Sequence, residues 1–422
     1  MIETRPQKTQ ERALLIGLEK EGVSKWDLQD SLDELRELAN SAGAEVVDTV
    51  TQKLRKPTAP YYIGRGKAES IKNSCQDRHV TSVIFDDELS PAQGRNLENL
   101  FARKVLDRTQ LILDIFAQRA RSREGRLQIE LAQLQYLLPR LTRMWHHLSR
   151  QTGGIGTRGP GETQLEVDRR RVQERIARLE RELEAVRKTR AIQRQGRKRH
   201  QWPVAAVVGY TNAGKSTLLN LLTGADVVTQ NKLFATLDPT TRSFVLPNKQ
   251  RVLLTDTVGF LRKLPHTLIE SFKATLEEVG EADLLIHIVD LSHPRVDEQM
   301  EAVDSVIKEL DAHGKQTLIV FNKIDNLPNR ELAESYVKRF PGSVAISART
   351  GEGVNKLVQT LENALSSWRL RSRLRIPSNE SALIAEIHRV GHVLELRYEG
   401  NDALIIAHVP PELAQKLERF AA

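Results

Sequence analysis

The stretch from residue 204 to residue 222 constrains the fold more than any other part of this sequence. An apolar run at 204–208 favours a strand, residues 209–217 read GYTNAGKST, and an apolar run at 218–222 favours a helix. A glycine-rich loop between a strand and a helix directs backbone N–H groups at phosphate oxygens. The sequence therefore predicts a P-loop α/β domain, whose phosphate-binding residues are Gly209, Tyr210, Thr211, Asn212, Ala213, Gly214, Lys215, Ser216 and Thr217.

Three further motifs follow in order, each after a predicted strand: D-x-x-G at 256–259, N-K-x-D at 322–325 and S-A-R at 347–349. A carboxylate at Asp325 can accept both guanine donors, the N1–H and the exocyclic amine, and adenine offers no such pair. The Gly259 N–H would contact the γ-phosphate, so that the segment at 260–280 would respond to hydrolysis. The order of the motifs predicts a GTP-binding domain, with contacts from Asp256, Thr257, Val258, Gly259, Asn322, Lys323, Ile324, Asp325, Ser347, Ala348 and Arg349.

Hydrolysis and Mg²⁺ binding are assigned to few residues. Lys215 would bridge the β- and γ-phosphates, Ser216 would offer its hydroxyl to Mg²⁺, and Asp256 would hold the ion through water. A threonine that senses the γ-phosphate should lie between the P-loop and residue 256. Similarity to related GTPases favours Thr236 as this direct ligand and leaves Thr240 as the alternative. The catalytic set is thus Lys215, Gly259 and Thr236, and the threonine segment adds Phe234, Ala235, Leu237 and Asp238 to the nucleotide contacts.

Phe260 follows D-x-x-G, where Ras-like enzymes have the glutamine that orients the attacking water. We therefore expect slow intrinsic hydrolysis, with the missing group supplied by a partner or by a cation. Asn212 in the P-loop is suggestive of K⁺-dependent GTPases, although turn chemistry alone explains an asparagine there. Phe260 could equally serve as an apolar anchor.

The flanks of this domain carry their own patterns. Strand-like runs at 13–18, 45–50, 82–86 and 104–106 alternate with helical patterns at 27–39 and 91–100, which predicts a small parallel α/β domain at 1–118. The G domain is placed at 201–370. After it, 369–378 is taken as a linker, and three strand-like runs with a final helix at 412–420 predict a small α+β domain at 371–422.

Residues 119–200 predict a basic helical hairpin. Two leucine-rich heptad stretches flank a glycine-rich tip at 153–163, and Pro139 should interrupt the first arm. Residues 121–200 contain 20 Lys and Arg but 9 Asp and Glu. The net charge of this segment, 20 − 9 = +11, exceeds the net charge of +8 of the whole chain. These side chains could be the solvated flanks of a coiled coil. Because neighbouring carboxylates are few, phosphate contact is favoured for Arg169, Arg170, Arg171, Arg197, Lys198 and Arg199.

Composition excludes some classes of protein. The single cysteine, Cys75, forbids an intrachain disulfide and is expected to be a buried structural thiol. No apolar run is long enough for a membrane span, and the first residues lack the apolar core of a signal peptide. We therefore expect a soluble, cytoplasmic monomer.

The GGIGTRGPGETQLE segment at 153–166, the YIGRGK segment at 62–67, the FATLD run and Phe260 together resemble the HflX family of bacterial GTPases. The resemblance spans nearly the whole chain. It implies binding of GTP and GDP, and binding to the large ribosomal subunit and its ribosomal RNA near the peptidyl transferase centre. It also implies splitting of stalled ribosomes under stress. The tip residues that would contact RNA are Gly154, Gly156, Arg158 and Gly159.

Members of that family also bind ATP, with an RNA-remodelling activity credited to the N-terminal region. No second P-loop motif is present, and residues 64–67 are better explained as a surface connection than as a phosphate-binding turn. Two other classes remain open. One is a nucleotide-gated binding factor in which occupancy alone displaces the small subunit. The other is an RNA-modifying GTPase, which would need a catalytic thiol or cofactor site.

Overall fold

The computed structural model describes residues 11–22, 24–141, 164–199, 202–224, 233–234, 236–263 and 278–422. Contacts divide the chain into two compact units. The first comprises Met1–Ala185, Lys232–Phe234 and Lys263–Ser271, and the second comprises Val186–Asn231, Ala235–Arg262 and Phe272–Ala422. Among the helices of these described ranges, none has the length and apolar character needed to cross a membrane.

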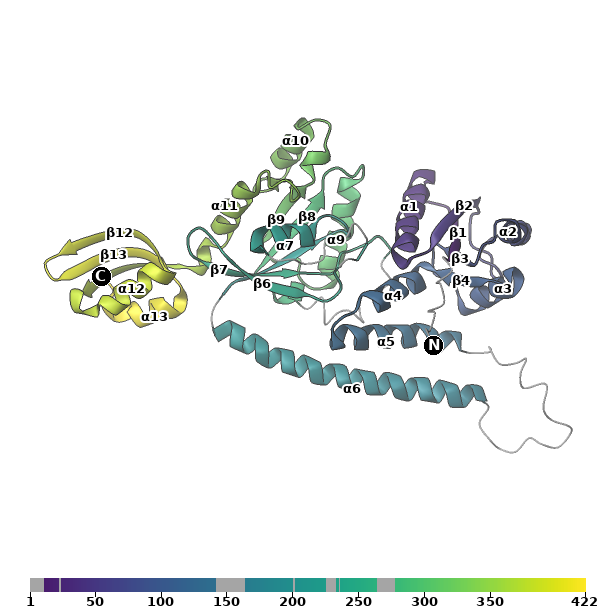
Figure 1. Ribbon diagram of the computed structural model, residues 1–422, viewed down its shortest axis with the longest axis horizontal. Helices are drawn as coiled ribbons and strands as arrows, with labels where there is room; N and C mark the ends of the chain where they lie inside the picture. Colours follow the sequence, from purple (N-terminus) through teal and green to yellow (C-terminus); the bar gives the residue numbers. More distant parts are fainter. Residues whose placement is uncertain are drawn as a thin grey trace, which may run out of the picture. The chain divides into compact units, whose positions relative to one another are not determined.

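The first unit contains a four-stranded parallel sheet in the order β2-β1-β3-β4 (Figure 1). Strand β1, one of the two inner strands, is buried on both faces, because its alternate residues contact helices on opposite faces of the sheet. Leu14 and Ile16 share a cluster with residues of α2 and α3, whereas a Cβ at Gly17 would meet Leu28 and Leu32 of α1. The elements are β1 (Arg12–Glu19), α1 (Lys25–Ala42), β2 (Glu45–Lys53), α2 (Arg65–Asp77), β3 (Ser82–Phe85), α3 (Pro91–Phe101), β4 (Lys104–Asp107) and α4 (Arg108–Arg119).

This arrangement agrees with the α/β pattern read from the sequence, with α2 and α4 as additions. Helix α2 was not anticipated, because its glycine, serine and lysine residues give a weak apolar pattern. Its buried side is short and includes Cys75, whose thiol pKa is raised by burial. The buried structural thiol is therefore confirmed.

Helices α5 (Arg123–Leu137) and α6 (Gln164–Arg199) lie side by side and form the hairpin (Figure 1). Leu127 and Leu131 of α5 pack against Leu179 and Leu183 of α6. Salt bridges from Glu130 to Arg175 and from Arg123 to Glu182 require the helices to be antiparallel, because the partner number falls as the other rises. Helix α5 ends before Pro139, which lies in the short 3₁₀ turn η1 (Leu138–Arg140).

The second unit contains a six-stranded sheet in the order β10-β9-β8-β5-β7-β6. All neighbouring pairs are parallel except β6 with β7, which is antiparallel. The elements are β5 (Val204–Gly209), α7 (Lys215–Thr223), β6 (Thr240–Val245), β7 (Arg251–Asp256), β8 (Leu284–Asp290), α9 (Val296–Glu309), β9 (Thr317–Asn322), η2 (Ile324–Asn326), α10 (Glu331–Arg339), β10 (Val344–Ala345), α11 (Val354–Ala364) and η3 (Ser366–Trp368).

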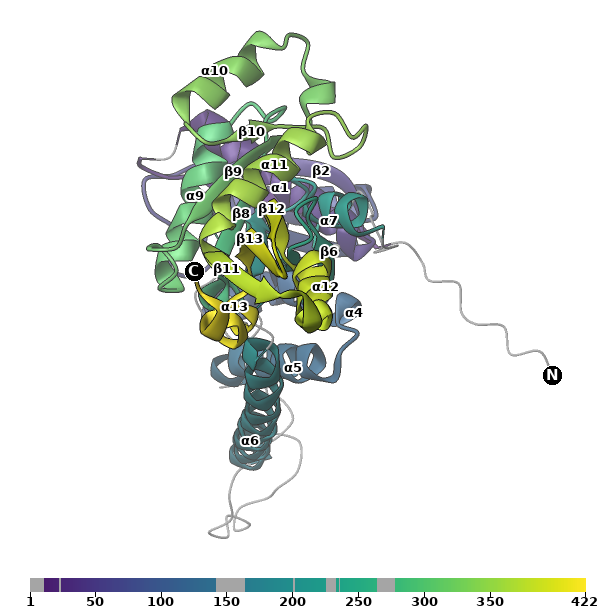
Figure 2. The same cartoon turned by 90° about the vertical axis from the view of Figure 1, so that its left-hand side faces the viewer.

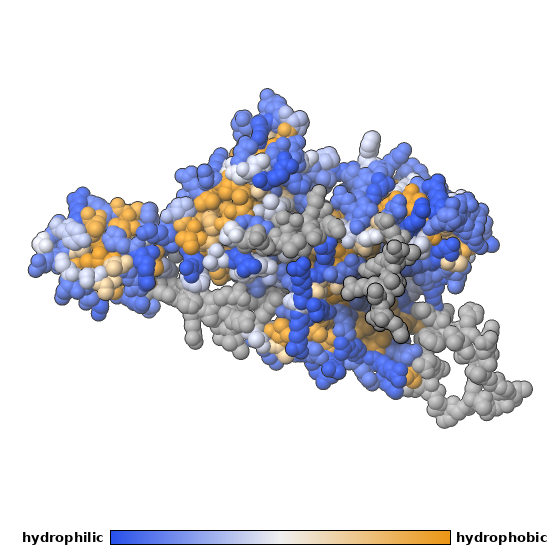
Figure 3. All heavy atoms as spheres, in the orientation of Figure 1, coloured by the Kyte–Doolittle hydropathy of each residue, from blue (hydrophilic) through white to orange (hydrophobic). Residues whose placement is uncertain are grey.

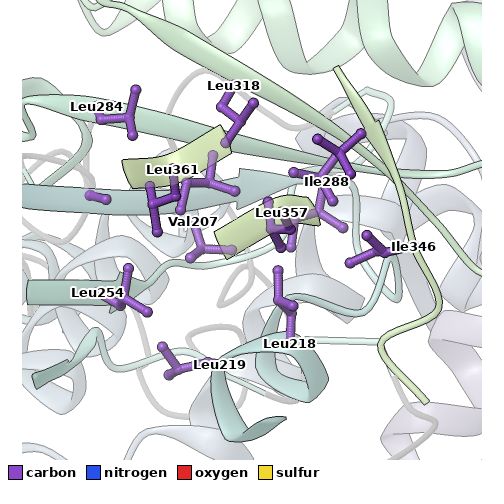
Figure 4. Packing of buried hydrophobic residues seen from close by; sticks show 14 of the residues in the cluster. Val207, Leu218, Leu219, Leu254, Leu284, Ile288, Leu318, Ile346, Leu357 and Leu361 are labelled. Atoms are coloured by element: carbon purple, nitrogen blue, oxygen red, sulfur yellow. The ribbon is translucent and has the colours of Figure 1, made fainter. Parts of the chain in front are cut away.

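Figure 4 shows the core on one side of this sheet, where strand residues meet α7 and α11. Leu218 of α7, Leu357 of α11 and Ile288 of β8 are almost fully buried in one cluster. The adjacent residue, Val289, joins a separate cluster with α9 and α10 on the other side. The sheet is therefore covered on both faces, as the near-continuous apolar strands require.

A three-stranded antiparallel sheet in the order β11-β13-β12 forms the C-terminal domain, with α12 and α13 on one face (Figure 2). The hydropathy view shows hydrophobic patches among hydrophilic residues on this domain (Figure 3). The elements are β11 (Leu370–Pro377), η4 (Ser378–Glu380), α12 (Ser381–Val390), β12 (His392–Glu399), β13 (Asp402–Val409), α13 (Pro411–Leu417) and η5 (Glu418–Phe420).

The linker expected at 369–378 is wrong, because that segment forms β11. Leu374 and Ile376 are buried against the helices, while Arg373 and Arg375 between them are exposed. The arginines concealed this alternation in the sequence, although a period of two is typical of a strand with one buried face.

A buried histidine makes the stability of the second unit depend on pH. His287 of β8 is 2% exposed, and burial, assisted by the charge of Lys215, lowers its pKa to about 4. The unfolded chain binds this proton near pH 6.5, so the stabilisation is complete above that pH and is lost as the pH falls toward 4. We expect a loss of about 3 kcal/mol over this window.

Thermal unfolding followed from pH 7 to pH 4 tests this expectation. The midpoint should fall less steeply in His287→Gln than in the parent, and the exposed His313→Gln serves as the control. Equal slopes in the parent and His287→Gln would contradict the assignment.

Candidate functional site

The P-loop lies between β5 and α7, at the carboxyl end of the central strand. Its last glycine, Gly214, has φ 100°, a region that favours glycine. A Cβ on Gly214 would lie 2.2 Å from Nδ2 of Asn322, so the loop also requires glycine for space. Helix α7 begins at Lys215, which directs its free backbone N–H groups toward the loop.

Lys215 is the buried cation of this loop. Its Nζ donates hydrogen bonds to the carbonyl oxygens of Gly209 at 3.2 Å and Tyr210 at 2.7 Å. Burial lowers its pKa to about 8, opposed by the nearby carboxylate of Asp256. The negative charge of Asp256 offsets only part of the lowering of the Lys215 pKa by burial. A phosphate group beside the amine would add negative charge and so favour the protonated amine.

Three oxygen-bearing side chains meet at the carboxyl end of β7. The Ser216 hydroxyl donates to Oδ2 of Asp256 at 2.6 Å and lies 2.9 Å from the Thr236 hydroxyl oxygen. The second carboxylate oxygen, Oδ1 of Asp256, is buried without a hydrogen-bond partner among the described residues. Burial raises the pKa of Asp256, and its hydrogen bonds and Lys215 oppose that rise.

These groups fit Mg²⁺, which prefers a few oxygen ligands and retains water. The unpartnered oxygen of Asp256 supplies an acceptor that a metal-bound water could use. Within the described ranges, no group of three or more His, Cys, Asp or Glu side chains is placed so that it could hold a metal ion. Thr240 lies at the start of β6, where its hydroxyl donates to the Asp238 carbonyl oxygen at 3.5 Å and no contact with Ser216 is recorded.

Phe260 belongs to the framework of the loop. Its N–H donates to the Gly209 carbonyl oxygen at 3.1 Å, and its own carbonyl oxygen accepts from the Thr211 N–H at 2.8 Å. The phenyl ring is 1% exposed, so it is an apolar anchor and presents no polar group to a water. The Tyr210 hydroxyl accepts from the N–H of Arg262 at 2.8 Å, a second link that the motif pattern did not reveal.

Asn322 connects the base-recognition loops to the P-loop. Its Nδ2 donates to the Ala213 carbonyl oxygen at 2.8 Å, and its Oδ1 accepts from the Ala348 N–H at 2.9 Å. Lys323 forms an ion pair with Asp290, with 2.6 Å between Nζ and Oδ2. Asp290 was not among the residues predicted from the sequence. The N-K-x-D motif is therefore held in place by its first two residues.

Asp325 forms an ion pair with Arg349, with 2.7 Å between Nη2 and Oδ2. The carboxylate is largely buried, whereas the arginine side chain is 73% exposed. Ser347 is fully buried, and its hydroxyl accepts from the Thr350 N–H at 3.1 Å. The chain thus brings the last two predicted motifs together, and the Arg349 contact was not foreseen because sequence spacing alone gives no partner.

Two pieces of the nucleotide-site loops belong to the first compact unit. The ring of Phe234 lies against Phe116, with 4.5 Å between ring centroids. Lys263 forms an ion pair with Asp86 at 2.6 Å. Burial alone would raise the pKa of Asp86, but Arg108 and Lys263 lower it to about 2.

Several predicted residues lie outside the described ranges or differ from expectation. Ala235 and the tip residues Gly154, Gly156, Arg158 and Gly159 are outside, as is most of the segment at 264–277. The expectation that Arg169, Arg170 and Arg171 lack carboxylate neighbours is wrong for two of them. Helical spacing brings Arg170 to 3.8 Å from Glu174 and Arg171 to 3.9 Å from Asp168. Arg197, Lys198 and Arg199 end α6.

Residues 64–67 lie at the start of α2. Gly64 precedes the helix, and its N–H donates to Oε1 of Gln52 at 2.9 Å. ATP binding in this region stays an untested prediction.

Comparison with known proteins covers nearly the whole chain. Models described as GTP-binding GTPase N-terminal, GTP-binding GTPase Middle Region and 50S ribosome-binding GTPase match residues 29–117, 119–197 and 204–323. The GTPase HflX of Caldanaerobacter subterraneus subsp. tengcongensis is 46% identical over 413 residues, 98% of this chain and 94% of the relative. The chain belongs to the HflX family of GTPases. The GTPase HflX of Escherichia coli is 47% identical over 365 residues, 86% of this chain and 85% of the relative.

A solved structure of a GTP-binding protein from Sulfolobus solfataricus in complex with GDP aligns over 85% of this chain and 99% of that chain, with TM-score 0.45 and 26% identity. The family confirms the resemblance seen in the sequence and the P-loop GTPase fold with its N-terminal domain. This member of the HflX family is thus a GTPase, while the role of each residue stays a prediction.

The Thr236 assignment predicts a change in Mg²⁺ requirement. Thr236→Ala should raise the Mg²⁺ concentration that half-saturates GTP hydrolysis, because one of two direct hydroxyl ligands is removed. Thr240→Ala is the matched control and should leave that concentration unchanged, since its hydroxyl is bonded elsewhere. A larger effect at Thr240 would reverse the assignment.

Base selectivity should depend on Asp325. We expect Asp325→Asn to weaken GTP binding at least about tenfold and to shift preference toward xanthosine triphosphate, because a charged acceptor for guanine is lost. The control Arg349→Gln removes the ion-pair partner but keeps the carboxylate, so guanine should still be preferred. Competition binding with the two nucleotides gives the answer, and an unchanged preference in Asp325→Asn would refute the role.

Proposed function

We propose that this HflX family member is a GTP-hydrolysing factor that binds the large ribosomal subunit and separates the subunits of stalled ribosomes. The observation that carries the proposal is the buried Phe260 at the site of the water-orienting residue, in a domain that matches a 50S ribosome-binding GTPase model. A P-loop GTPase without its own polar group there needs an external activator. The ribosomal subunit is that activator in our proposal.

In this function the P-loop and β7 bind the triphosphate. Lys215 and the Gly259 N–H would stabilise charge on the γ-phosphate, and Thr236 would help to orient that group. Space at Gly259 is restricted, because a Cβ there would lie 2.9 Å from the Lys215 amine. Bound Mg²⁺ supplies charge stabilisation for the phosphate oxygens, with Ser216, Thr236 and Asp256 as the residues that would hold it.

Intrinsic hydrolysis is slow in this proposal because the side chain after Gly259 is apolar and turned into the core. Potassium is a second candidate for the missing charge. Asn212 has φ 60°, a left-handed conformation that asparagine tolerates, so turn geometry alone accounts for it. Comparing rates in K⁺ and Na⁺ separates the two explanations.

The hairpin provides the RNA-binding surface. Its described ion pairs at Arg170 and Arg171 are long and solvent-exposed, so they contribute little and can exchange for phosphates. The glycine-rich tip, with Arg158, would enter the RNA-lined cavity near the peptidyl transferase centre. Neutralising several phosphates makes such binding weaken steeply with salt.

Whether hydrolysis drives separation or only recycles the factor distinguishes two versions of this function. Splitting in one round with a non-hydrolysable GTP analogue would assign hydrolysis to recycling. Failure of the analogue, with GTP effective, would assign it to the separation itself.

The decisive measurement is GTP hydrolysis with and without large ribosomal subunits across a salt series. We expect stimulation that fades as salt rises, in both K⁺ and Na⁺. Deleting residues 153–161 should preserve basal hydrolysis and abolish the stimulation, because the tip contacts RNA and not the nucleotide. Small subunits are the control, and stimulation that survives the deletion would refute the role of the tip.

A further inference from the structure

A hollow lies within the second unit, between the start of β7 and the C-terminal domain. Its volume is about 540 Å³. Arg251 opens β7 and Asp256 ends it, so the hollow is about 16 Å along the strand from the Mg²⁺ ligands. It is therefore distinct from the GTP site at the carboxyl ends of the strands. Its charged and aromatic lining residues are Trp202, Lys249, Arg251, Trp368, Arg369, Glu386, Arg389 and Lys416.

The lining has a strong excess of positive charge. Five of these side chains are Lys or Arg and one is Glu. None of the five takes part in an ion pair between described residues, in contrast to Arg170, Arg171 and Arg178 of α6. Cations that line a concave site without carboxylate partners favour an anionic ligand.

Two buried polar groups in the lining lack partners. Arg369 is 7% exposed, and its Nη atoms donate to the carbonyl oxygens of Asn248 at 2.9 Å and Val390 at 3.2 Å, but its Nε has no acceptor within the described ranges. Gln250 is 5% exposed, and its Oε1 has no donor there. A buried donor and a buried acceptor without partners are rare and call for an explanation.

The connection between the two domains does not provide that explanation. It is made by the Nη atoms of Arg369 and by Lys249, whose Nζ donates to the His388 carbonyl oxygen at 2.8 Å. Nε of Arg369 and Oε1 of Gln250 are not used in it. The two atoms thus belong to residues that line the hollow and are themselves buried.

Two tryptophans give the hollow aromatic surfaces. The Arg251 guanidinium lies over the Trp202 ring, 4.8 Å from its centroid. Trp368 packs against the apolar core of the G domain. Both rings are partly exposed. Indole faces beside guanidinium groups are the surfaces on which nucleobases stack, with phosphates bound by the neighbouring cations.

We propose that this hollow binds a nucleotide, with its base against the tryptophan surfaces and its phosphate among Arg369, Arg389 and Lys416. The nucleotide is either free in solution or one residue of a single-stranded RNA, since both present the same base and phosphate. This site goes beyond the GTPase function and does not depend on it.

The test uses the full-length protein saturated with GDP and Mg²⁺, so that the P-loop site is filled. ADP, pyrophosphate and a uridine pentanucleotide are titrated separately, with binding followed by calorimetry and tryptophan fluorescence. We expect ADP or the pentanucleotide to bind one site per chain, with pyrophosphate weaker than whichever binds. Binding of ADP alone identifies a free nucleotide, and binding of the pentanucleotide alone identifies RNA.

Variants locate the binding. Arg389→Glu with Lys416→Glu should weaken it at least about tenfold, because two exposed phosphate-binding cations are reversed. Arg371→Glu with Arg373→Glu is the control, since it makes the same charge change on exposed residues of β11 outside the lining. Trp202→Leu should weaken the base-containing ligands but not pyrophosphate.

Three results would overturn the proposal: no saturable binding of ADP or the pentanucleotide, equal weakening by the control pair, or pyrophosphate binding as tight as that of either base-containing ligand. GTP hydrolysis measured on the same variants should equal that of the parent, because the hollow is remote from the GTP site. A negative result for nucleotide binding in the hollow can therefore be told apart from an error in the GTPase assignment.

Discussion

Parallel pairing of β5, β7, β8 and β9 is the constraint on which the nucleotide site depends. Strands that run in the same direction end at the same edge, so loops up to about a hundred residues apart in sequence converge. Asn322 then fixes their spacing, with one hydrogen bond to the P-loop and one to the loop at 347–349. Because the Asn322 amide lies so close to the P-loop, position 214 must be glycine, since any side chain there would collide with that amide.

The same edge explains why Phe260 can be both structural and catalytically consequential. Its backbone pairs with the P-loop on both sides of Tyr210, as a short continuation of the parallel sheet. This pairing directs the Phe260 ring into the core, where it stabilises the loop. The position after D-x-x-G therefore carries no polar side chain that could act near the γ-phosphate. In the proposed function, a group that activates water would come from outside this segment, and the rate would then respond to a partner.

Much of the fold and the core of the site could be predicted, because their signals are local. The P-loop, D-x-x-G and N-K-x-D motifs each combine a strand with fixed neighbours. The missed features are of a different kind. The ion pair between Asp325 and Arg349 joins two loops, and the strand β11 was concealed because arginines occupy its exposed face. Neither pairing partners nor burial can be read from composition.

Charge gives the clearest case of this limit. From the sequence, α6 had the most conspicuous basic surplus, yet helical spacing gives Arg170, Arg171 and Arg178 carboxylate neighbours three or four residues away. The hollow beside β7 collects its cations from four separate segments, and none of them forms an ion pair between described residues, although Glu386 lies three residues before Arg389. Because attraction for an anion depends on the charge that remains unpaired, a cluster that no run of sequence reveals can bind as strongly as a basic helix. The fold, and not the local count of Lys and Arg, therefore decides where phosphates bind.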